Sequence, residues 1–189
     1  ASLQDQAEDL NGSIFTYGAD ITNEMKIEEI VETIEKKIGS IDLAILNAGT
    51  YIRFGIEDFS ASAFAKQINV NVNGTVNCLA PVMKSMKARG QGQIAIVSSL
   101  SGYRGLPLAS AYGASKAALT NMCEALKVEL EPFGVTLSVV QPGFIKTPLT
   151  EKNNFPMPFL MEAELAAKRI LIGIEKKKFE IVLPTRFAY

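Results

Sequence analysis

The sequence predicts an α/β fold, a doubly wound parallel sheet with helices on both faces. Short apolar runs rich in β-branched residues alternate at least four times with segments of helical periodicity. Several of these runs are apolar at almost every position, as strands buried on both faces are. The length of 189 residues fits one domain, which we expect to span residues 1–189.

The first half of the chain is expected to contribute two strands and two helical segments. The second apolar run ends in a glycine turn, and the first helix shows apolar residues at three- and four-residue steps before Gly39. The strands are predicted over 13–19 and 41–49, and the helices over 23–37 and 60–88, the latter interrupted around 70–74.

The second half continues the alternation and adds a loop rich in proline. Its strands are predicted over 92–99, 135–143 and 179–183, its helices over 110–132 and 162–176, and its loop over 147–158. Three layers of secondary structure, α/β/α, follow from this order.

Composition excludes several functions. The 19 basic residues against 20 acidic ones leave no surplus of positive charge, so no nucleic-acid partner is expected. No histidine is present, which excludes His-dependent nucleophilic catalysis and His-ligated metals, and two cysteines are too few for a cysteine metal site or a disulfide scaffold. We therefore expect no metal. No apolar run reaches the length of a membrane span and residues 1–10 lack the form of a secretory signal, so the expected compartment is the cytoplasm.

Unusual residues follow four of the predicted strands. In open parallel sheets, ligands bind outside the carboxyl ends of the strands. Any one of these residues is also explained by the ordinary use of glycine and proline to end strands, but their joint occurrence indicates a binding crevice. They are Asp20, Asn47-Ala48-Gly49, Ser98-Ser99 and Pro142-Gly143.

Tyr112 and Lys116 stand four residues apart at the start of a predicted helix. This spacing places both side chains on one face, where an ammonium group is expected to lower the pKa of the phenol towards neutrality. A tyrosine of that kind serves as a general acid or base without histidine. Taken alone, the pair also occurs by chance on many helices.

Ser99 and Asn71 add to this pair. Ser99 ends a buried strand 13 residues before Tyr112, where its alternative role is to cap the turn. Asn71 lies within an otherwise helical stretch, where asparagine competes for backbone hydrogen bonds and opens the helix locally. Spacing alone does not separate it from Asn69, Asn73 and Asn77.

Five ordered motifs resemble those of the short-chain dehydrogenase/reductases. They are NAG at 47–49, NVNGT around Asn71, IVSS ending at Ser99, YGASK at 112–116 and PGFIKT at 142–147. The resemblance covers residues 10–189 and implies a Rossmann-like fold. It also implies an enzyme that uses NAD or NADP to move hydride to or from a carbonyl or alcohol substrate.

The resemblance assigns a role to each catalytic candidate. Tyr112 would protonate the carbonyl oxygen or deprotonate the alcohol, and Lys116 would lower the pKa of Tyr112 and bind the nicotinamide ribose. Ser99 would hold the substrate oxygen, and Asn71 would support a water-linked proton relay through Lys116. The implied cofactor contacts are Asp20, Ile21, Asn47, Ala48, Gly49, Tyr112, Lys116, Pro142, Gly143, Ile145 and Thr147.

The sequence departs from the family at its start. The family's first βαβ unit carries a glycine-rich turn that binds the pyrophosphate, and no such turn is present here. We expect that unit, and the residue that selects NAD or NADP, to be missing from this chain. Either the chain is part of a longer protein or it is a short form. The first explanation is favoured, because losing central strands would expose the apolar runs at 43–49 and 94–99.

Substrate and partners are less constrained. The loop from 153 to 158 is interpreted as a lid over a non-polar substrate, and the family resemblance implies a homodimer or homotetramer formed through 60–88 and 110–132. The alternatives are a non-catalytic Rossmann-fold binding or scaffold protein and, from Lys176-Lys177-Lys178, a membrane-associated module. The residues expected to line the substrate pocket, each equally consistent with plain packing, are Tyr51, Tyr103, Phe144, Phe155, Met157 and Phe159.

Overall fold

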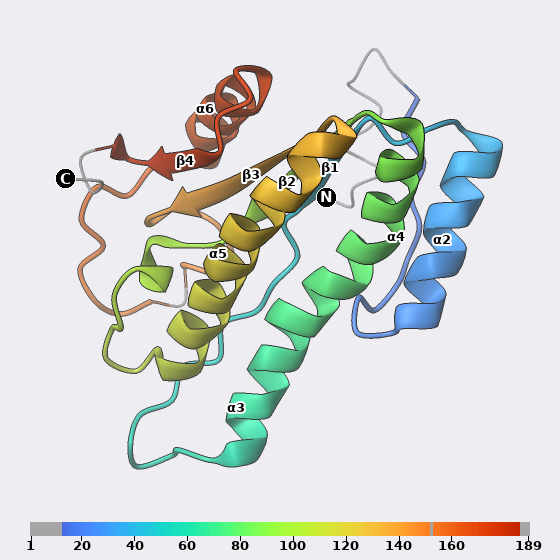
Figure 1. The fold of residues 1–189 in the computed structure, drawn as a ribbon. Coiled ribbons are helices and arrows are strands. Elements are labelled where there is room, and N and C mark those ends of the chain that lie inside the picture. Colours follow the sequence, from blue (N-terminus) through green and yellow to red (C-terminus); the bar gives the residue numbers. More distant parts are fainter. Residues whose placement is uncertain (1–12, 152, 186–189) are drawn as a thin grey trace.

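The computed structural model describes residues 13–151 and 153–185. Four parallel strands form one sheet in the order β1-β2-β3-β4, so each strand lies beside its neighbour in sequence (Figure 1). Helices connect the strands, as parallel neighbours require. The strands are β1 (Leu43–Leu46), β2 (Gly92–Val97), β3 (Val135–Pro142) and β4 (Glu180–Leu183).

The helices cover both faces of this sheet, which confirms the predicted α/β class (Figure 1). The larger core joins α2, α4 and α5 to β1, β2 and β3, and a smaller core joins α6 to β2, β3 and β4. Successive side chains of β2 point to opposite faces of the sheet, because Ile94 and Ile96 belong to the larger core and Ala95 belongs to the smaller one. The helices are α2 (Glu24–Lys37), α3 (Ala61–Ile68), α4 (Gly74–Arg89), α5 (Ser110–Leu130) and α6 (Ala163–Glu175).

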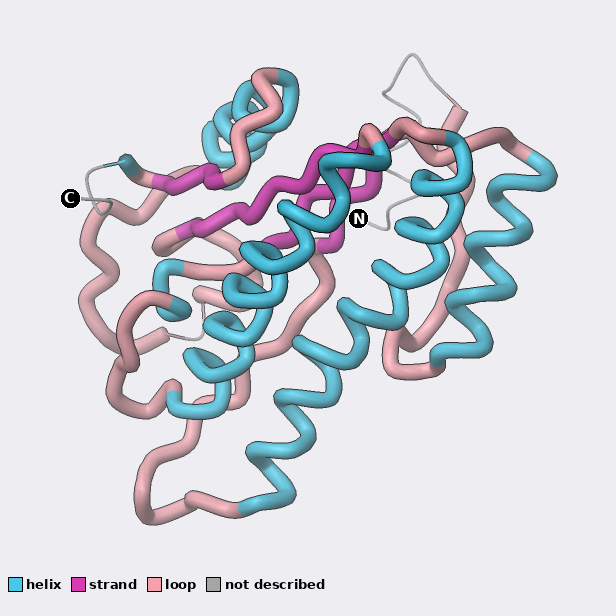
Figure 2. Tube along the Cα trace, viewed as in Figure 1, coloured by secondary structure: helices cyan, strands magenta, loops and turns pink. Residues whose placement is uncertain are grey.

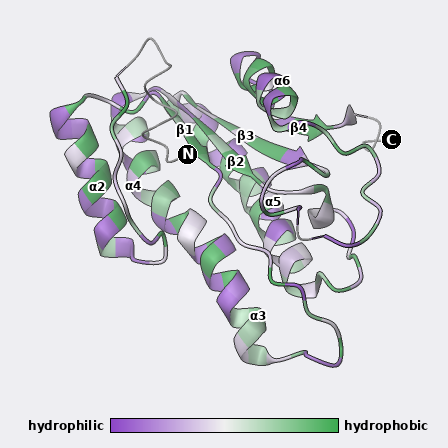
Figure 3. Ribbon diagram, turned by 180° about the vertical axis from the view of Figure 1, so that it is seen from behind, coloured by the Kyte–Doolittle hydropathy of each residue, from purple (hydrophilic) through white to green (hydrophobic). Residues whose placement is uncertain are grey.

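Hydropathy follows these layers. In Figure 3 the strands are mainly hydrophobic, whereas α2, at the outer end of its layer, is largely hydrophilic. Only Ile27 and Val31 of α2 are buried, one turn apart on the face that packs on α4. The helix begins where the Asn23 side chain accepts a hydrogen bond from the Lys26 backbone N–H, as a typical N-cap does.

The long helical stretch after β1 is interrupted where the sequence predicts. A π-helical turn, Asn69–Asn73, joins α3 to α4, and the Gly74 N–H donates to the Asn69 carbonyl five residues earlier. Such turns add one residue to a helix and rotate the side chains within them. Here the turn directs Asn71 into the protein, where it is fully buried.

The prediction of a strand over 13–19 is wrong. Residues 13–20 form an irregular, exposed segment. A strand needs a partner for its backbone N–H and C=O groups, and β1 pairs with β2 alone among the described strands. The β-branched and aromatic composition of 13–19 is therefore not sufficient to form a strand here.

The uncovered end of the sheet exposes apolar side chains. Leu43 and Ile45 of β1 are 40% and 44% exposed, while Ala44 between them is buried in the larger core. The helix on their side, α6, packs instead over β2, β3 and β4. Within the described part of the chain, no helix combines the length and the apolar character needed to cross a membrane.

Candidate active site

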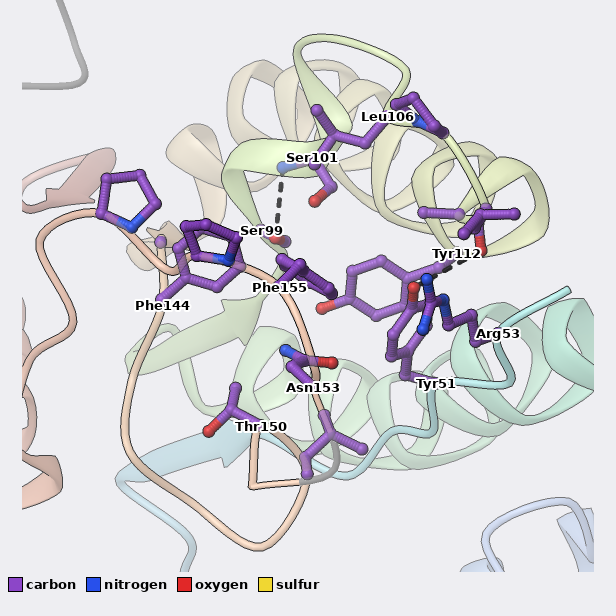
Figure 4. A pocket seen from close by; sticks show the side chains of 17 residues that line it. Tyr51, Arg53, Ser99, Ser101, Leu106, Tyr112, Phe144, Thr150, Asn153 and Phe155 are labelled. Carbon is purple, nitrogen blue, oxygen red and sulfur yellow. Dashed lines mark hydrogen bonds between the residues drawn. The ribbon is translucent and has the colours of Figure 1, made fainter. Parts of the chain in front are cut away.

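Three loops meet beyond the carboxyl ends of the strands, at the end where the sequence predicts a crevice (Figure 2). They follow β1, β2 and β3 and span residues 47–60, 98–109 and 143–162. Together they enclose a cavity of about 580 Å³ (Figure 4). The cavity is lined by Tyr51, Arg53, Ser99, Ser101, Leu106, Pro107, Leu108, Ala109, Tyr112, Gly143, Phe144, Leu149, Thr150, Asn153, Phe155, Pro156 and Pro158.

Ser99 stands at the end of β2 and lines this cavity. Its hydroxyl oxygen accepts a hydrogen bond from the Ser101 N–H at 3.1 Å and donates a long one to the Pro142 carbonyl at 3.4 Å. The residue therefore caps the short 3₁₀ turn Leu100–Gly102, as its alternative role requires, and also faces the cavity. Its weak contact with Pro142 leaves the O–H proton available to another acceptor.

Tyr112 lies in the first turn of α5, and its hydroxyl end is directed towards the side of the cavity where Ser99 lies (Figure 4). Its ring packs against Tyr51 with 5.1 Å between the ring centroids. Burial raises the pKa of the Tyr112 phenol above its usual value, the Ser99 hydroxyl opposes this rise and Tyr51 adds to it.

The predicted effect of Lys116 on Tyr112 is wrong in this structure. The two side chains do share a face of α5, and the Lys116 Nζ lies 5.7 Å from the centroid of the Tyr112 ring. The ammonium group donates to the Val97 carbonyl at 2.8 Å, so it is directed towards the end of β2. Burial therefore decides the direction of the phenol's shift.

Lys116 is itself buried, with 5% of its surface exposed. Burial lowers the pKa of its ammonium group to about 8. Gly49 lies directly against this group, because a Cβ at that position would be 3.7 Å from the Lys116 Nζ and 3.4 Å from the Asn71 Oδ1. The structure thus brings together three predicted site residues from the loop after β1, the π-helical turn and α5.

Asn71 is held by both ends of its amide. Its Oδ1 accepts from the Thr50 N–H at 2.7 Å, and its Nδ2 donates to the Thr50 carbonyl at 3.0 Å and to the Ser115 Oγ at 2.9 Å. Burial and these contacts separate it from the other asparagines of the motif. The Asn73 side chain donates to the Asn69 side chain on the surface, and the Asn77 side chain donates to the Ile21 carbonyl.

Gln67 was not predicted from the sequence and is fully buried one helical turn before Asn71. Its Oε1 accepts a short hydrogen bond from the Ile52 N–H. Gln67 and Asn71 therefore hold the backbone on both sides of Tyr51. The available signal was their spacing of four residues, which places two amides on one helix face.

A second set of buried polar residues fixes α5 to β2. The Lys116 carbonyl accepts from the Ser98 Oγ at 2.8 Å and from the Thr120 Oγ1 at 3.0 Å. The Gln141 Nε2 of β3 donates to the same Thr120 hydroxyl at 3.2 Å. These buried hydrogen bonds fix the position of the Lys116 backbone relative to the end of β2.

The remaining predicted cofactor contacts come from three segments of the chain. Asp20 is exposed, and hydrogen bonds from the Thr22 N–H and hydroxyl lower the pKa of its carboxyl group. The Ile21 side chain lies against Gly74 and the larger core. Ile145 and Thr147, beyond the cavity lining, belong to a turn held by the Thr150 hydroxyl, which donates to the Ile145 carbonyl at 2.6 Å.

Gly143 does line the cavity, and its N–H donates to the Leu183 carbonyl at 2.6 Å, which ties the segment after Pro142 to β4. Asn47 and Ala48 lead from the end of β1 to Gly49.

Three of the six residues predicted for the substrate pocket line it. Tyr51, Phe144 and Phe155 do so, and the rings of Phe144 and Phe155 pack edge to face at 6.0 Å. Tyr103 does not, since its hydroxyl bonds to Glu180. Met157 and Phe159 are also outside the lining, although Asn153, Phe155, Pro156 and Pro158 of the same segment are part of it.

A parallel sheet with helices on both faces and a cavity beyond the carboxyl ends of its strands is typical of the class of nucleotide-binding α/β proteins. The family model for short chain dehydrogenases matches residues 1–157. The chain belongs to this family, whose members use NAD or NADP to oxidise CH–OH groups or reduce C=O groups.

Similar proteins span much of this family. An uncharacterised oxidoreductase of Myxococcus xanthus is 35% identical over 99% of this chain and 76% of its own length. The human 17-beta-hydroxysteroid dehydrogenase type 1 is 36% identical over 75% of this chain, which corresponds to 42% of that enzyme. The 3-oxoacyl-[acyl-carrier-protein] reductase FabG of Thermotoga maritima is 36% identical over 80% of this chain and 61% of its own length.

Solved structures agree in fold. A short-chain dehydrogenase/reductase from Burkholderia xenovorans superimposes with a TM-score of 0.83 at 24% identity, over 94% of this chain and 76% of that one. ElxO, solved with NADP bound, superimposes with a TM-score of 0.78 at 28% identity, over 88% of this chain and 75% of its own.

The residues around Gly49 fit a nucleotide cofactor. A lysine ammonium has three donors, and Val97 is the one acceptor that the described residues offer it. A side chain at position 49 would fill the space in front of Lys116 and Asn71. Glycine there leaves room for a hydroxyl-bearing group to reach the buried ammonium. No group of three or more His, Cys, Asp or Glu side chains is placed to hold a metal ion within 13–151 and 153–185.

Proposed function

We propose that this chain moves hydride between NAD or NADP and a carbonyl or alcohol compound, with Tyr112 as the general acid or base. The observation that carries the proposal is the shared position of Ser99 and Tyr112. Both line one largely apolar cavity at the carboxyl end of the sheet, and Lys116 follows Tyr112 by one turn of α5. The nicotinamide of the bound cofactor supplies or accepts the hydride.

In reduction, Tyr112 gives a proton to the carbonyl oxygen. The phenol is protonated at neutral pH, as a general acid must be, and the burial that raises its pKa makes it a weaker acid than a free tyrosine. Ser99 donates a second hydrogen bond to the same oxygen, since its O–H proton makes only a long bond to the Pro142 carbonyl and can turn towards the substrate. In oxidation, Tyr112 must first lose its proton, and the hydrogen bond with the Ser99 hydroxyl favours the resulting phenolate.

Lys116 binds the cofactor ribose through its remaining N–H groups. Asn71 acts as a positioning residue, because its amide is fully committed to Thr50 and Ser115. The water-linked proton relay through Asn71 and Lys116 stays a prediction. The other residues assigned to the cofactor are Asp20, Ile21, Asn47, Ala48, Gly49, Pro142, Gly143, Ile145 and Thr147.

The test is the oxidation of NADH and NADPH over a panel of ketones and aldehydes, with Tyr112→Phe as the variant. The loss of a general acid lowers kcat by about 10²- to 10⁴-fold. Tyr103→Phe is the matched control, because Tyr103 loses the same hydroxyl outside the cavity. Equal rates for the wild-type protein and Tyr112→Phe on the same carbonyl would show that the proposed mechanism is wrong. A protein that binds cofactor but reduces nothing would favour the non-catalytic alternative.

A further inference from the structure

Arg53 is the one charged residue among the described residues that line the cavity. The other side chains there are apolar or neutral, and many belong to leucine, proline or phenylalanine. A cavity of this kind favours an apolar ligand. An apolar ligand alone gives no reason for a positively charged side chain at the cavity wall.

The guanidinium group of Arg53 has no acidic partner in the described parts of the chain, since the ion pairs found there involve other residues. Its Nη1 donates to the Asn154 Oδ1 at 2.7 Å, and its Cζ lies 5.8 Å from the centroid of the Phe155 ring. An arginine has five N–H donors. Most of them therefore stay available to an acceptor that enters the cavity.

Arg53 is an exposed residue at the cavity wall, and the backbone directly before it is fixed relative to the reacting centre. Gln67 and Asn71 hold the backbone at Ile52 and Thr50, directly before Arg53. The charge of Arg53 acts on the phenol of Tyr51, and the Tyr51 ring packs on the Tyr112 ring. Figure 4 shows Arg53 beside Tyr51 at this wall of the cavity.

We propose that the substrate is an apolar carbonyl or alcohol compound that also carries an oxyanion, such as a carboxylate, which Arg53 binds. This inference rests on the proposed function for the position of the reacting carbon, beside Tyr112. Arginine suits the task because its planar fork pairs with an oxyanion through two hydrogen bonds. The apolar part of the substrate lies against the leucines and phenylalanines of the cavity.

A purely structural role predicts something different. Through Asn154, Arg53 also joins the loop after β1 to the loop after β3. If that were its sole role, its removal would weaken the binding of charged and neutral substrates alike. The decisive quantity is therefore the ratio of kcat/KM for a charged substrate to that for its neutral twin.

The experiment compares 9-oxodecanoate with its methyl ester, which differ in charge at one end, with NADH or NADPH as reductant. We expect the wild-type protein to prefer the acid, and Arg53→Gln to lower the acid-to-ester ratio about tenfold, mainly through KM for the acid. Arg53→Lys should restore part of the ratio, and added salt should reduce it. Arg104→Gln is the control, because it removes the same charge from an exposed residue outside the cavity. A ratio unchanged in Arg53→Gln would overturn the proposal.

A binding measurement separates this proposal from the proposed function. Calorimetric titration with decanoate and with 1-decanol requires neither cofactor nor turnover. We expect decanoate to bind more tightly than 1-decanol, and Arg53→Gln to remove that difference. If no carbonyl is reduced but this difference is found, the proposed function fails while the anion site stands. If decanoate shows no advantage in the wild-type protein, the anion site is wrong whatever the enzyme reduces.

Discussion

At the scale of single residues, Lys116 carries a measurable electrostatic cost. Burial lowers its pKa from 10.5 to about 8. Below pH 8 both the folded and the unfolded protein hold this proton, and the folded state bears the cost of a buried charge. Between pH 8 and 10.5 the unfolded chain binds more protons, so the contribution of Lys116 to the free energy of unfolding rises with pH.

The size of this effect follows from the shift. At about 1.4 kcal/mol per pKa unit, the stability of the wild-type protein relative to Lys116→Met should rise by about 3 kcal/mol between pH 7 and pH 10.5. Urea unfolding at both pH values measures it. Lys146→Met is the control, because it removes the same charge from a side chain that is 58% exposed. A pH-independent difference for Lys116→Met would mean that its ammonium is well solvated.

The residues that sequence patterns predict well are those whose role is defined locally. The Tyr112–Lys116 spacing places both side chains on one helix face in any α-helix, and Ser99 has to emerge where its strand ends. The pKa of Tyr112 was predicted in the wrong direction because the helix spacing does not show that the Lys116 ammonium bonds to Val97. Arg53 and Gln67 were missed because their roles depend on the path of the loop after β1.

At the scale of secondary structure, helices were predicted better than isolated strands. The helix over 23–37 carries its own N-cap and satisfies its own hydrogen bonds, and it forms as expected with bounds Glu24–Lys37. The segment 13–19 has the composition of a strand, but its hydrogen bonds must come from another strand. The residues of the segment do not show whether a partner strand is present, so the strand predicted from composition alone is wrong.

The lid role of the segment 153–158 stays a prediction. Asn153, Phe155, Pro156 and Pro158 line the cavity, and Phe155 packs on Phe144. Deletion of 153–158 should raise KM by about tenfold or more for an apolar substrate, because one wall of the cavity is lost. Steady-state kinetics with 9-oxodecanoate methyl ester measures it, with the melting temperature as a check of folding. An unchanged KM would show that the segment 153–158 is not a lid over the substrate.

At the scale of the whole molecule, two exposed apolar regions are candidates for self-association. One is the face of β1 that shows Leu43 and Ile45, and the other lies on α5, where Val128 is 68% exposed. The expected homodimer or homotetramer, paired through 60–88 and 110–132, stays a prediction.

Sedimentation velocity distinguishes the two regions. If the helices pair, Val128→Lys should shift the protein towards the monomer while Ile45→Lys leaves the assembly intact. The reverse result would place the contact on the open face of the sheet and contradict the expected pairing. Each change puts one charge on an exposed position, so the folded monomer should tolerate both.

The site has two parts with separate supports. Asn71 bonds to Thr50 and Ser115, the Ser115 hydroxyl donates to the Tyr112 carbonyl, and the Lys116 ammonium donates to the Val97 carbonyl. Within the described residues, none of these hydrogen bonds involves the loop after β3. That loop is held by contacts of its own through Thr150 and Phe155, and its Asn154 accepts a hydrogen bond from Arg53 of the loop after β1. Substitutions that accumulate in it can therefore change which compound is accepted while the proton-transfer groups keep their geometry. Natural variation, or a library of substitutions confined to 148–160, can therefore change the substrate specificity while the catalytic residues stay the same.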